Sequence, residues 1–201
     1  MRWWLLGRGA RRDRRKRRAW IAAGRPAPAP SVVKHGIVRD YAERYDLGTL
    51  VETGTYKGGT IDALRHRFRR IYSIELDDAL YARARARFAG LSHVTILHGD
   101  SAQVLPALLG ELTDPALFWL DGHYSGPGTA KGRRETPILE EIHAILAHPV
   151  PGHVILIDDA RVFGTWPDYP TMDEFRTLIT TTAPTLNFTV DDDIIRLTPK
   201  Q

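Results

Sequence analysis

Six acidic side chains lie at or just beyond the ends of short apolar runs that the sequence predicts as β-strands. They are Glu52, Glu75, Asp100, Asp121, Asp158 and Asp159. In an α/β protein the carboxyl ends of parallel strands meet at one edge of the sheet, and ligands bind in the crevice there. A carboxylate can accept hydrogen bonds from a ribose, hold a cation or take up a proton. We therefore expect a polar binding site along this edge.

A glycine-rich turn follows the first of these strands, between Glu52 and Thr60. The dinucleotide-binding fingerprint needs a glycine where Tyr56 stands, because the backbone there approaches a pyrophosphate. The phosphate-binding loop of nucleoside triphosphatases needs a lysine where Thr60 stands. The pattern that remains is E-x-G-x-x-x-G, made by Glu52, Gly54 and Gly58. Such a turn can approach a ligand without contacting phosphates.

Apolar periodicity and turn residues predict five strand–helix units followed by a hairpin. The strands are expected at 49–52, 71–75, 94–97, 116–121 and 153–157, and the hairpin at 186–190 and 194–197. The helices are expected at 31–45 with Ser31 as N-cap, at 60–69, from Asp77 or Asp78, after Asp100 with Pro106 in the first turn, from Thr136 and Pro137, and at 171–181. The connection 191–193 is too short for a crossover, so the last two strands should be antiparallel. Helix 31–45 is expected to cover the sheet edge or to form a lid over the site.

Charge is distributed unevenly along the 201 residues. Residues 1–30 carry ten Lys and Arg against one acid, whereas residues 31–201 carry 18 against 23. The net charge of +4 therefore belongs to the first 30 residues and gives no reason to expect nucleic-acid binding by the remainder. Pro26, Pro28 and Pro30 alternate with alanine and predict an extended spacer. We expect a basic, Pro/Ala-rich disordered tail over 1–30, or a start codon assigned too far upstream, and a single domain over 31–201.

Composition also bears on location. The chain has no cysteine, which excludes disulfides and thiolate metal sites. No apolar run approaches the ~20 residues that span a bilayer, and the first 30 residues lack the apolar core of a signal peptide. We therefore expect a cytoplasmic protein without a transmembrane segment, although a basic, aromatic tail could also touch anionic lipid or RNA.

The glycine turn, the acid after the second strand, the Gly99-Asp100 pair and the terminal hairpin stand in the order found in one family. Residues 48–198 resemble a class I S-adenosylmethionine-dependent methyltransferase. The resemblance implies a Rossmann-like α/β fold with a seven-stranded sheet, mostly parallel with a C-terminal antiparallel hairpin, and helices on both faces. It also implies S-adenosylmethionine as cofactor. By this resemblance Glu52, Gly54, Thr55 and Gly58 line the methionine end of the cofactor, Glu75 holds the ribose, and Asp100 and Ser101 flank the adenine.

Asp121, Asp158 and Asp159 follow the fourth and fifth predicted strands, and close like charges of this kind need a proton or a cation between them. Three oxygen ligands suit magnesium or manganese. The placement resembles metal-dependent O-methyltransferases of the catechol and macrocin types, in which a bound metal would lower the pKa of an acceptor hydroxyl. His123 is the candidate general base, and Lys131 is a second candidate. Alternatively, Asp121 or Asp158 caps the next segment and His123 only braces the loop.

The chemical nature of the methyl acceptor depends on the segment after the fourth predicted strand. Residues 122–135 do not match the substrate segments of either methyltransferase type. Lys131, Arg133, Arg134 and Arg161 favour an anionic acceptor such as a phosphorylated or carboxylated sugar. The leading hypothesis is methyl transfer to a hydroxyl of a small molecule, a sugar or a natural-product-like compound. A binding or scaffold protein with the same fold, a metal-assisted oxidation or hydrolysis, and an RNA-modifying methyltransferase stay open as alternatives, as does the oligomeric state.

Overall fold

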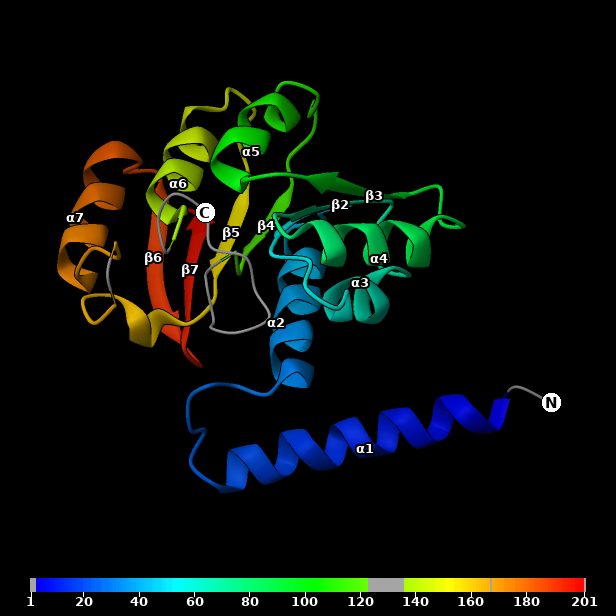
Figure 1. Cartoon of the computed structure of the whole chain (residues 1–201). Helices are drawn as coiled ribbons and strands as arrows, with labels where there is room; N and C mark the ends of the chain where they lie inside the picture. Colours follow the sequence, from blue (N-terminus) through cyan, green and yellow to red (C-terminus); the bar gives the residue numbers. More distant parts are fainter. Residues whose placement is uncertain (1–2, 123–135, 167, 201) are drawn as a thin grey trace.

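The computed structural model describes residues 3–122, 136–166 and 168–200, with side chains described from residue 11 onward. Its centre is a seven-stranded sheet in the order β3-β2-β1-β4-β5-β7-β6 (Figure 1). The strands are β1 (Thr49–Thr53), β2 (Arg70–Glu75), β3 (Val94–His98), β4 (Leu117–Leu120), β5 (Val154–Ile157), β6 (Leu186–Asp191) and β7 (Ile194–Pro199). The first five are parallel, and β7 is antiparallel to both β5 and β6. The seven-stranded α/β sheet with a C-terminal hairpin is therefore confirmed.

The centre of the sheet is covered on both faces, and strands β4 and β5 contain only apolar residues. Every residue of β1, β4 and β5 is buried, which is typical of parallel strands packed between two helical layers. Strands β6 and β7 are joined by Asp192 and Asp193, both with positive φ (55° and 64°). Two consecutive residues with positive φ are characteristic of a type I′ turn, which matches the twist of a hairpin.

Helices form a layer on each face of the sheet (Figure 1). One layer contains α5 (Ser101–Leu109), α6 (Ile138–Ala147) and α7 (Met172–Thr182), and the other contains α2 (Ser31–Arg44), α3 (Gly59–Leu64) and α4 (Asp78–Phe88). Each layer packs on the sheet through its own apolar cluster. A short 3-10 helix, η1 (Ala160–Val162), follows β5. The loops that follow the parallel strands therefore lie at the carboxyl edge of the sheet, together with the start of α2.

Three local predictions about helices need correction. Pro106 is the sixth residue of α5 and not part of its first turn, and the short helix continues for three residues beyond it. Ser31 is the first residue of α2, with Pro30 in the N-cap position. Helix α3 ends at Leu64, five residues before the predicted end. In contrast, Asp77 caps α4 as expected, since its side chain accepts a hydrogen bond from the Leu80 amide.

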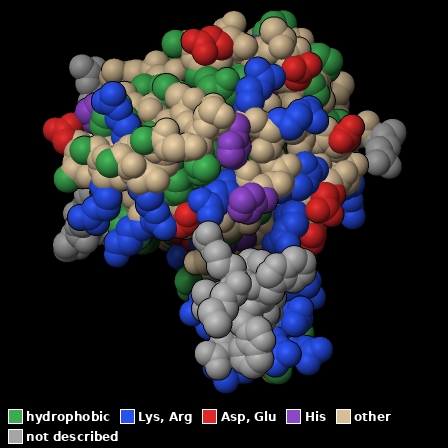
Figure 2. Space-filling view, turned by 90° about the vertical axis from the view of Figure 1, so that its right-hand side faces the viewer, with side chains coloured by type: hydrophobic (Ala, Val, Ile, Leu, Met, Phe, Trp, Pro, Cys, Tyr) green, Lys and Arg blue, Asp and Glu red, His purple; other side chains and the backbone are tan. Residues whose placement is uncertain are grey.

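The N-terminal segment also differs from the prediction. Residues expected to be disordered form helix α1 (Trp3–Ala22), which lies outside the body of the domain (Figure 1). Arginine and alanine, which dominate this segment, favour helix, and no proline occurs before Pro26. Trp20 is buried against Ala29 and Val33, and its indole nitrogen donates to the Pro26 carbonyl at 2.8 Å. Lys and Arg side chains are prominent on the visible part of α1 (Figure 2). Within the described residues, no helix combines the length and apolar character needed to cross a membrane.

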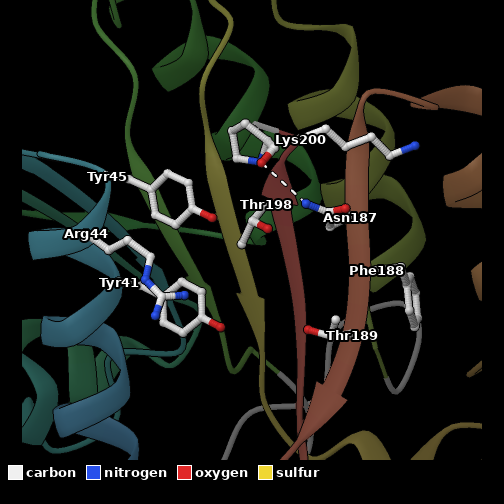
Figure 3. A pocket seen from close by; sticks show the side chains of 9 residues that line it. Tyr41, Arg44, Tyr45, Asn187, Phe188, Thr189, Thr198 and Lys200 are labelled. Carbon is white, nitrogen blue, oxygen red and sulfur yellow. Dashed lines mark hydrogen bonds between the residues drawn. The ribbon is translucent and has the colours of Figure 1, made fainter.

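A hollow of about 810 Å³ lies between α2 and the hairpin (Figure 3). It is lined by Tyr41, Arg44, Tyr45, Asn187, Phe188, Thr189, Thr198, Pro199 and Lys200. None of the six acids at the strand ends contributes to its lining. The hollow is therefore separate from the edge at which the sequence predicts a binding site.

Candidate functional site

The glycine turn connects β1 to α3 and lies against the end of β4. Gly54 has a φ of +86°, and a Cβ atom there would lie 2.5 Å from the carbonyl oxygen of Asp121. Gly58, with a φ of +71°, would place a Cβ atom 2.6 Å from the ring of Phe88. Both positions therefore need glycine for conformation and for space. This turn, the predicted cofactor loop, therefore lies directly against Asp121.

Glu75, at the end of β2, is held by backbone amides of the neighbouring loops. Its Oε2 accepts from the Tyr56 amide at 2.7 Å, and its Oε1 accepts from the Asp77 amide at 2.9 Å. The residue is only 6% exposed. Each carboxylate oxygen has a second lone pair, so the group can still accept from two ligand hydroxyls. The structure thus fixes the orientation of Glu75 beside the glycine turn.

Glu52 lies beneath the turn and not on its surface. It is 1% exposed, and Ser73 donates a hydrogen bond to its Oε2 at 2.5 Å. Thr55 is also buried and shares a 2.6 Å hydrogen bond with the same serine hydroxyl. Burial raises the pKa of Glu52 to about 7, against the hydrogen bonds from Ser73 and Thr60 that lower it. Within the described structure Glu52 and Thr55 therefore support the turn, and their contact with a cofactor stays a prediction.

The end of β3 carries Asp100 and Ser101. Asp100 is the N-cap of α5 and accepts from the Ala102 amide at 3.0 Å. Ser101 is buried and hydrogen-bonds to Glu141, which comes from α6. Glu141 is 1% exposed, and burial raises its pKa to about 7. Glu141 was not predicted as a site residue, although it sits at the i+3 position of the apolar stripe that begins at Ile138, where a carboxylate is out of place.

Asp121, Asp158 and Asp159 do come together, as the sequence predicts. One carboxylate oxygen from each lies within 4.8 Å of the others. Strand pairing sets this arrangement, because the Asp121 amide donates to the Thr53 carbonyl at 3.1 Å and the Asp158 amide donates to the Leu120 carbonyl at 3.0 Å. Burial, and then the charge of Asp158, raise the pKa of Asp121 well above its ordinary value. Burial also raises the pKa of Asp158.

A cation already contacts this acidic cluster. Lys34, in the first turns of α2, forms an ion pair with Asp158 and lies 3.6 Å from Oδ1 of Asp159. Burial lowers the pKa of Lys34, but the neighbouring aspartates outweigh this effect and raise it. Lys34 lies in the helix that was expected to cover the sheet edge or to form a lid, but its pairing with the acids was not predicted. The pair could have been predicted from two facts together: three acids end neighbouring strands, and the helix expected at the sheet edge carries a lysine.

The cluster partly satisfies the requirements of a divalent metal. Its oxygen ligands are of the kind that magnesium prefers. However, the ammonium of Lys34 is hydrogen-bonded to one of these carboxylates, Asp158. A metal bound by all three acids would have to displace it, because two cations repel strongly at such separations. Metal binding therefore stays a prediction, and Lys34 would compete with the metal for Asp158.

Arg161 no longer supports the prediction of an anionic acceptor. The Arg161 guanidinium donates to Asp159 at 2.7 Å and also forms an ion pair with Asp193 in the hairpin turn, so its charge is already matched by acids. The other three cations of that expectation, Lys131, Arg133 and Arg134, lie outside the described residues, as does the candidate base His123.

One aromatic side chain near the acids was not predicted. Tyr169 packs edge-on against Phe163, with ring centroids 5.0 Å apart. Burial raises the pKa of its hydroxyl, which hydrogen-bonds to Thr136 and feels the charges of Asp159, Glu141 and Asp121. Tyr169 thus contributes a polar tip to the neighbourhood of the cluster, although its position in a loop gave no periodic signal in the sequence.

Comparison with solved structures identifies the fold. The O-methyltransferase TomG of Streptomyces achromogenes, solved with S-adenosylmethionine, has 21% sequence identity and a TM-score of 0.61, over 93% of this chain and 88% of that one. The methyltransferase PaMTH1 of Podospora anserina, bound to S-adenosylhomocysteine, has 16% identity and a TM-score of 0.62, over 100% and 97%. An O-methyltransferase of Bacillus cereus, also with S-adenosylhomocysteine, has 18% identity and a TM-score of 0.63, over 92% and 90%.

Sequence comparison is less informative. No protein-family model matches the sequence. No curated protein matches it either. Because these three structures are each below 25% identity, they show that this chain has the class I methyltransferase fold, and its chemistry must be argued from its own residues.

Proposed function

We propose that this chain is an S-adenosylmethionine-dependent methyltransferase that acts on a hydroxyl group of a small molecule. The observation that carries the proposal is the position of the glycine turn, which lies between Glu75 and the cluster of three aspartates. On one side, the Tyr56 amide of the turn binds Glu75. On the other side, Gly54 lies against the backbone of Asp121. A cofactor held by Glu75 would therefore have its reactive end directed toward Asp121, Asp158 and Asp159.

On the donor side, the chain supplies a fixed carboxylate and a turn with little side-chain bulk. Glu75 would accept hydrogen bonds from both ribose hydroxyls, and Asp100 and Ser101 would lie beside the adenine. The close approach of Gly54 and Gly58 to their neighbours would allow the methionine end to lie against the backbone. When bound, the cofactor supplies an electrophilic methyl group on a sulfonium sulfur and leaves as S-adenosylhomocysteine.

On the acceptor side, the acids would orient a hydroxyl and remove its proton. As the new oxygen–methyl bond forms and the sulfur–methyl bond breaks, the electron pair of the broken bond stays on sulfur. The hydroxyl proton would pass to the carboxylate of Asp121, whose raised pKa makes it a stronger base than an exposed aspartate once it is ionised. His123 and Lys131 stay candidates for the same role. No covalent enzyme intermediate is needed.

Magnesium assistance is a second form of the proposal, favoured by the all-oxygen ligands of the acidic cluster. Asp121, Asp158 and Asp159 would hold the ion, which would lower the pKa of the acceptor hydroxyl. This form requires Lys34 to leave Asp158. A cytoplasmic location and a single domain over 31–201 stay predictions from the sequence, as does an anionic acceptor.

Calorimetric titration of the whole chain with S-adenosylhomocysteine tests the proposal. We expect saturable binding of one molecule per chain and no binding of NAD. Glu75→Ala should weaken the binding about 100-fold, because two hydrogen bonds to a charged group are each worth about 1.5 kcal/mol or more. The exposed Glu111 provides the matched control, and Glu111→Ala should leave the affinity unchanged.

The outcomes separate the alternatives. If wild-type protein binds no adenosyl ligand, the cofactor assignment is wrong. If it binds the ligand but methylates no member of a broad panel of hydroxyl compounds, the alternative of a binding or scaffold protein with this fold is favoured.

A further inference from the structure

The acidic cluster at the ends of β4 and β5 contains its own positive charge. Within the described part of the chain, the ammonium of Lys34 contacts Asp158 by an ion pair and approaches Asp159 to 3.6 Å. The Asp158 side chain is completely buried, and that of Lys34 is 17% exposed. A buried carboxylate needs a partner of opposite charge, and Lys34 is that partner.

The helix holds Lys34 in this position from both sides. One residue before it, Val33 packs against Trp20 and Ala29 in the small cluster that joins α1 to α2. One turn after it, Val38 is completely buried against the sheet. Side chains four residues apart share one face of a helix, so the lysine is directed toward the sheet by the same packing as Val38. Lys34 is thus a component of the fold and not a surface side chain that happens to reach the acids.

The second cation near the cluster strengthens this arrangement. Arg161 donates to Asp159 at 2.7 Å and forms an ion pair with Asp193, so it spans the end of β5 and the hairpin turn. Its own backbone amide donates to the same Asp193 carboxylate at 2.9 Å. Asp158 and Asp159 therefore each have a basic partner that is fixed by a separate element.

We propose that Lys34 occupies the place of a divalent cation in this acidic cluster, so that the site operates without bound metal. The inference rests on the proposed function, because the acids matter for catalysis only if an acceptor binds beside them. It assigns Lys34 as a positioning residue that keeps the two β5 aspartates in place and supplies the positive charge that a metal would bring. It also explains how three carboxylates can have oxygen atoms within 4.8 Å of one another. The ammonium of Lys34 offsets part of the repulsion between their negative charges.

Manganese binding tests the proposal directly, since Mn²⁺ takes the same oxygen ligands as magnesium and enhances water-proton relaxation when bound. The full chain is freed of metal with a chelator and titrated with Mn²⁺. We expect wild-type protein to bind Mn²⁺ at least about tenfold more weakly than Lys34→Ala, because affinity at such sites depends strongly on the net charge of the ligand set. The double variant Lys34→Ala, Asp158→Asn should lose the increase in Mn²⁺ affinity that Lys34→Ala alone produces.

Two further variants control for side effects. Arg39→Ala removes an exposed cation from the same helix and should not change Mn²⁺ binding. Lys34→Gln removes the charge but keeps a hydrogen-bond donor for Asp158, so it should gain Mn²⁺ affinity even if the alanine variant does not fold. Tight Mn²⁺ binding by wild-type protein, or equal binding by wild type and Lys34→Gln, would overturn the proposal.

A parallel titration with S-adenosylhomocysteine in the presence of the chelator keeps this result distinct from that of the proposed function. If the adenosyl ligand binds and Mn²⁺ behaves as expected, both proposals are supported. If the ligand does not bind, the methyltransferase proposal fails by itself, while the Mn²⁺ titrations still decide whether Lys34 blocks the cluster.

Discussion

Glu141→Gln should change how the stability of the fold depends on pH. Glu141 is 1% exposed, and burial raises its pKa from 4.5 to about 7. Among the described residues, its Oε1 has no well-formed hydrogen bond, and neither does the nearby Oγ1 of Thr53. The nearby hydroxyls of Ser101 and Thr53 lower the pKa of Glu141, but this effect is smaller than that of burial. The ionised form of Glu141 is consequently costly in the folded protein.

The sign and size of the effect follow from linkage. A folded-state pKa above the unfolded value means that the folded protein binds the proton more tightly, so stability falls as pH rises between the two values. For a shift from 4.5 to about 7, the free energy of unfolding should fall by about 2.5 kcal/mol between pH 5 and pH 8. Glutamine is neutral throughout this range and resembles the protonated acid in shape. The variant should therefore be more stable than the wild type by about 1 kcal/mol at pH 5 and by about 3 kcal/mol at pH 8.

Urea denaturation from pH 5 to pH 8 measures this difference. Glu52 has a similarly raised pKa of about 7 and contributes its own pH dependence, but it is present in both proteins and cancels from the comparison. At pH 8 the variant should melt about 6–12 °C higher, given about 2–4 °C per kcal/mol for a chain of this size. Glu111→Gln, at an exposed position, should follow the wild type. Parallel stability curves for wild type and Glu141→Gln would show that the buried acid does not titrate in this range and would refute the reasoning.

Two further perturbations test the glycine turn and the N-terminal helix. Gly54→Ala should destabilise the protein by about 2–4 kcal/mol, because the new Cβ would lie 2.5 Å from the Asp121 carbonyl at a positive φ, whereas Gly59→Ala, with nothing within 4 Å, should be nearly neutral in the same thermal melt. An equal loss for both would contradict this account of the turn. Deletion of residues 1–30 should leave the affinity for S-adenosylhomocysteine within about twofold, since no described contact joins α1 to Glu75, but should speed amide hydrogen exchange at 31–37, where Trp20 packs in the intact chain. A large loss of affinity would show instead that α1 belongs to the cofactor site.

Local sequence signals located most of the fold. The strands were predicted to within one or two residues, because short apolar runs bounded by Gly and Asp are distinctive in an α/β chain. The antiparallel hairpin followed from the length of its connection, and the cap at Asp77 from its position before an apolar helix. The gathering of Asp121, Asp158 and Asp159 was also predictable, since the ends of adjacent parallel strands must lie together.

The features that the sequence did not reveal depend on tertiary packing. The Lys34–Asp158 pair joins residues 124 positions apart, and nothing local marks either one as the partner of the other. Helix α1 depends on a balance between good helix formers and strong charge repulsion, which composition alone does not settle. Pro106 could be placed near a helix start from its type, but not assigned to a turn, because helix starts are uncertain by one or two residues.

The hairpin turn imposes an order on the assembly of the chain during synthesis. Arg25, before α2, contacts Asp192 in this turn across 167 residues of sequence, and Lys34 reaches Asp158 across 124. At about 5–20 residues per second, a ribosome would make Asp192 roughly ten to thirty seconds after Arg25. Strand β7 also inserts between β5 and β6, so the sheet cannot be finished before the last strands have emerged. Arg25 and Lys34 therefore stay without their acidic partners until β5 and the hairpin have been made, and the rim of the candidate site closes only then.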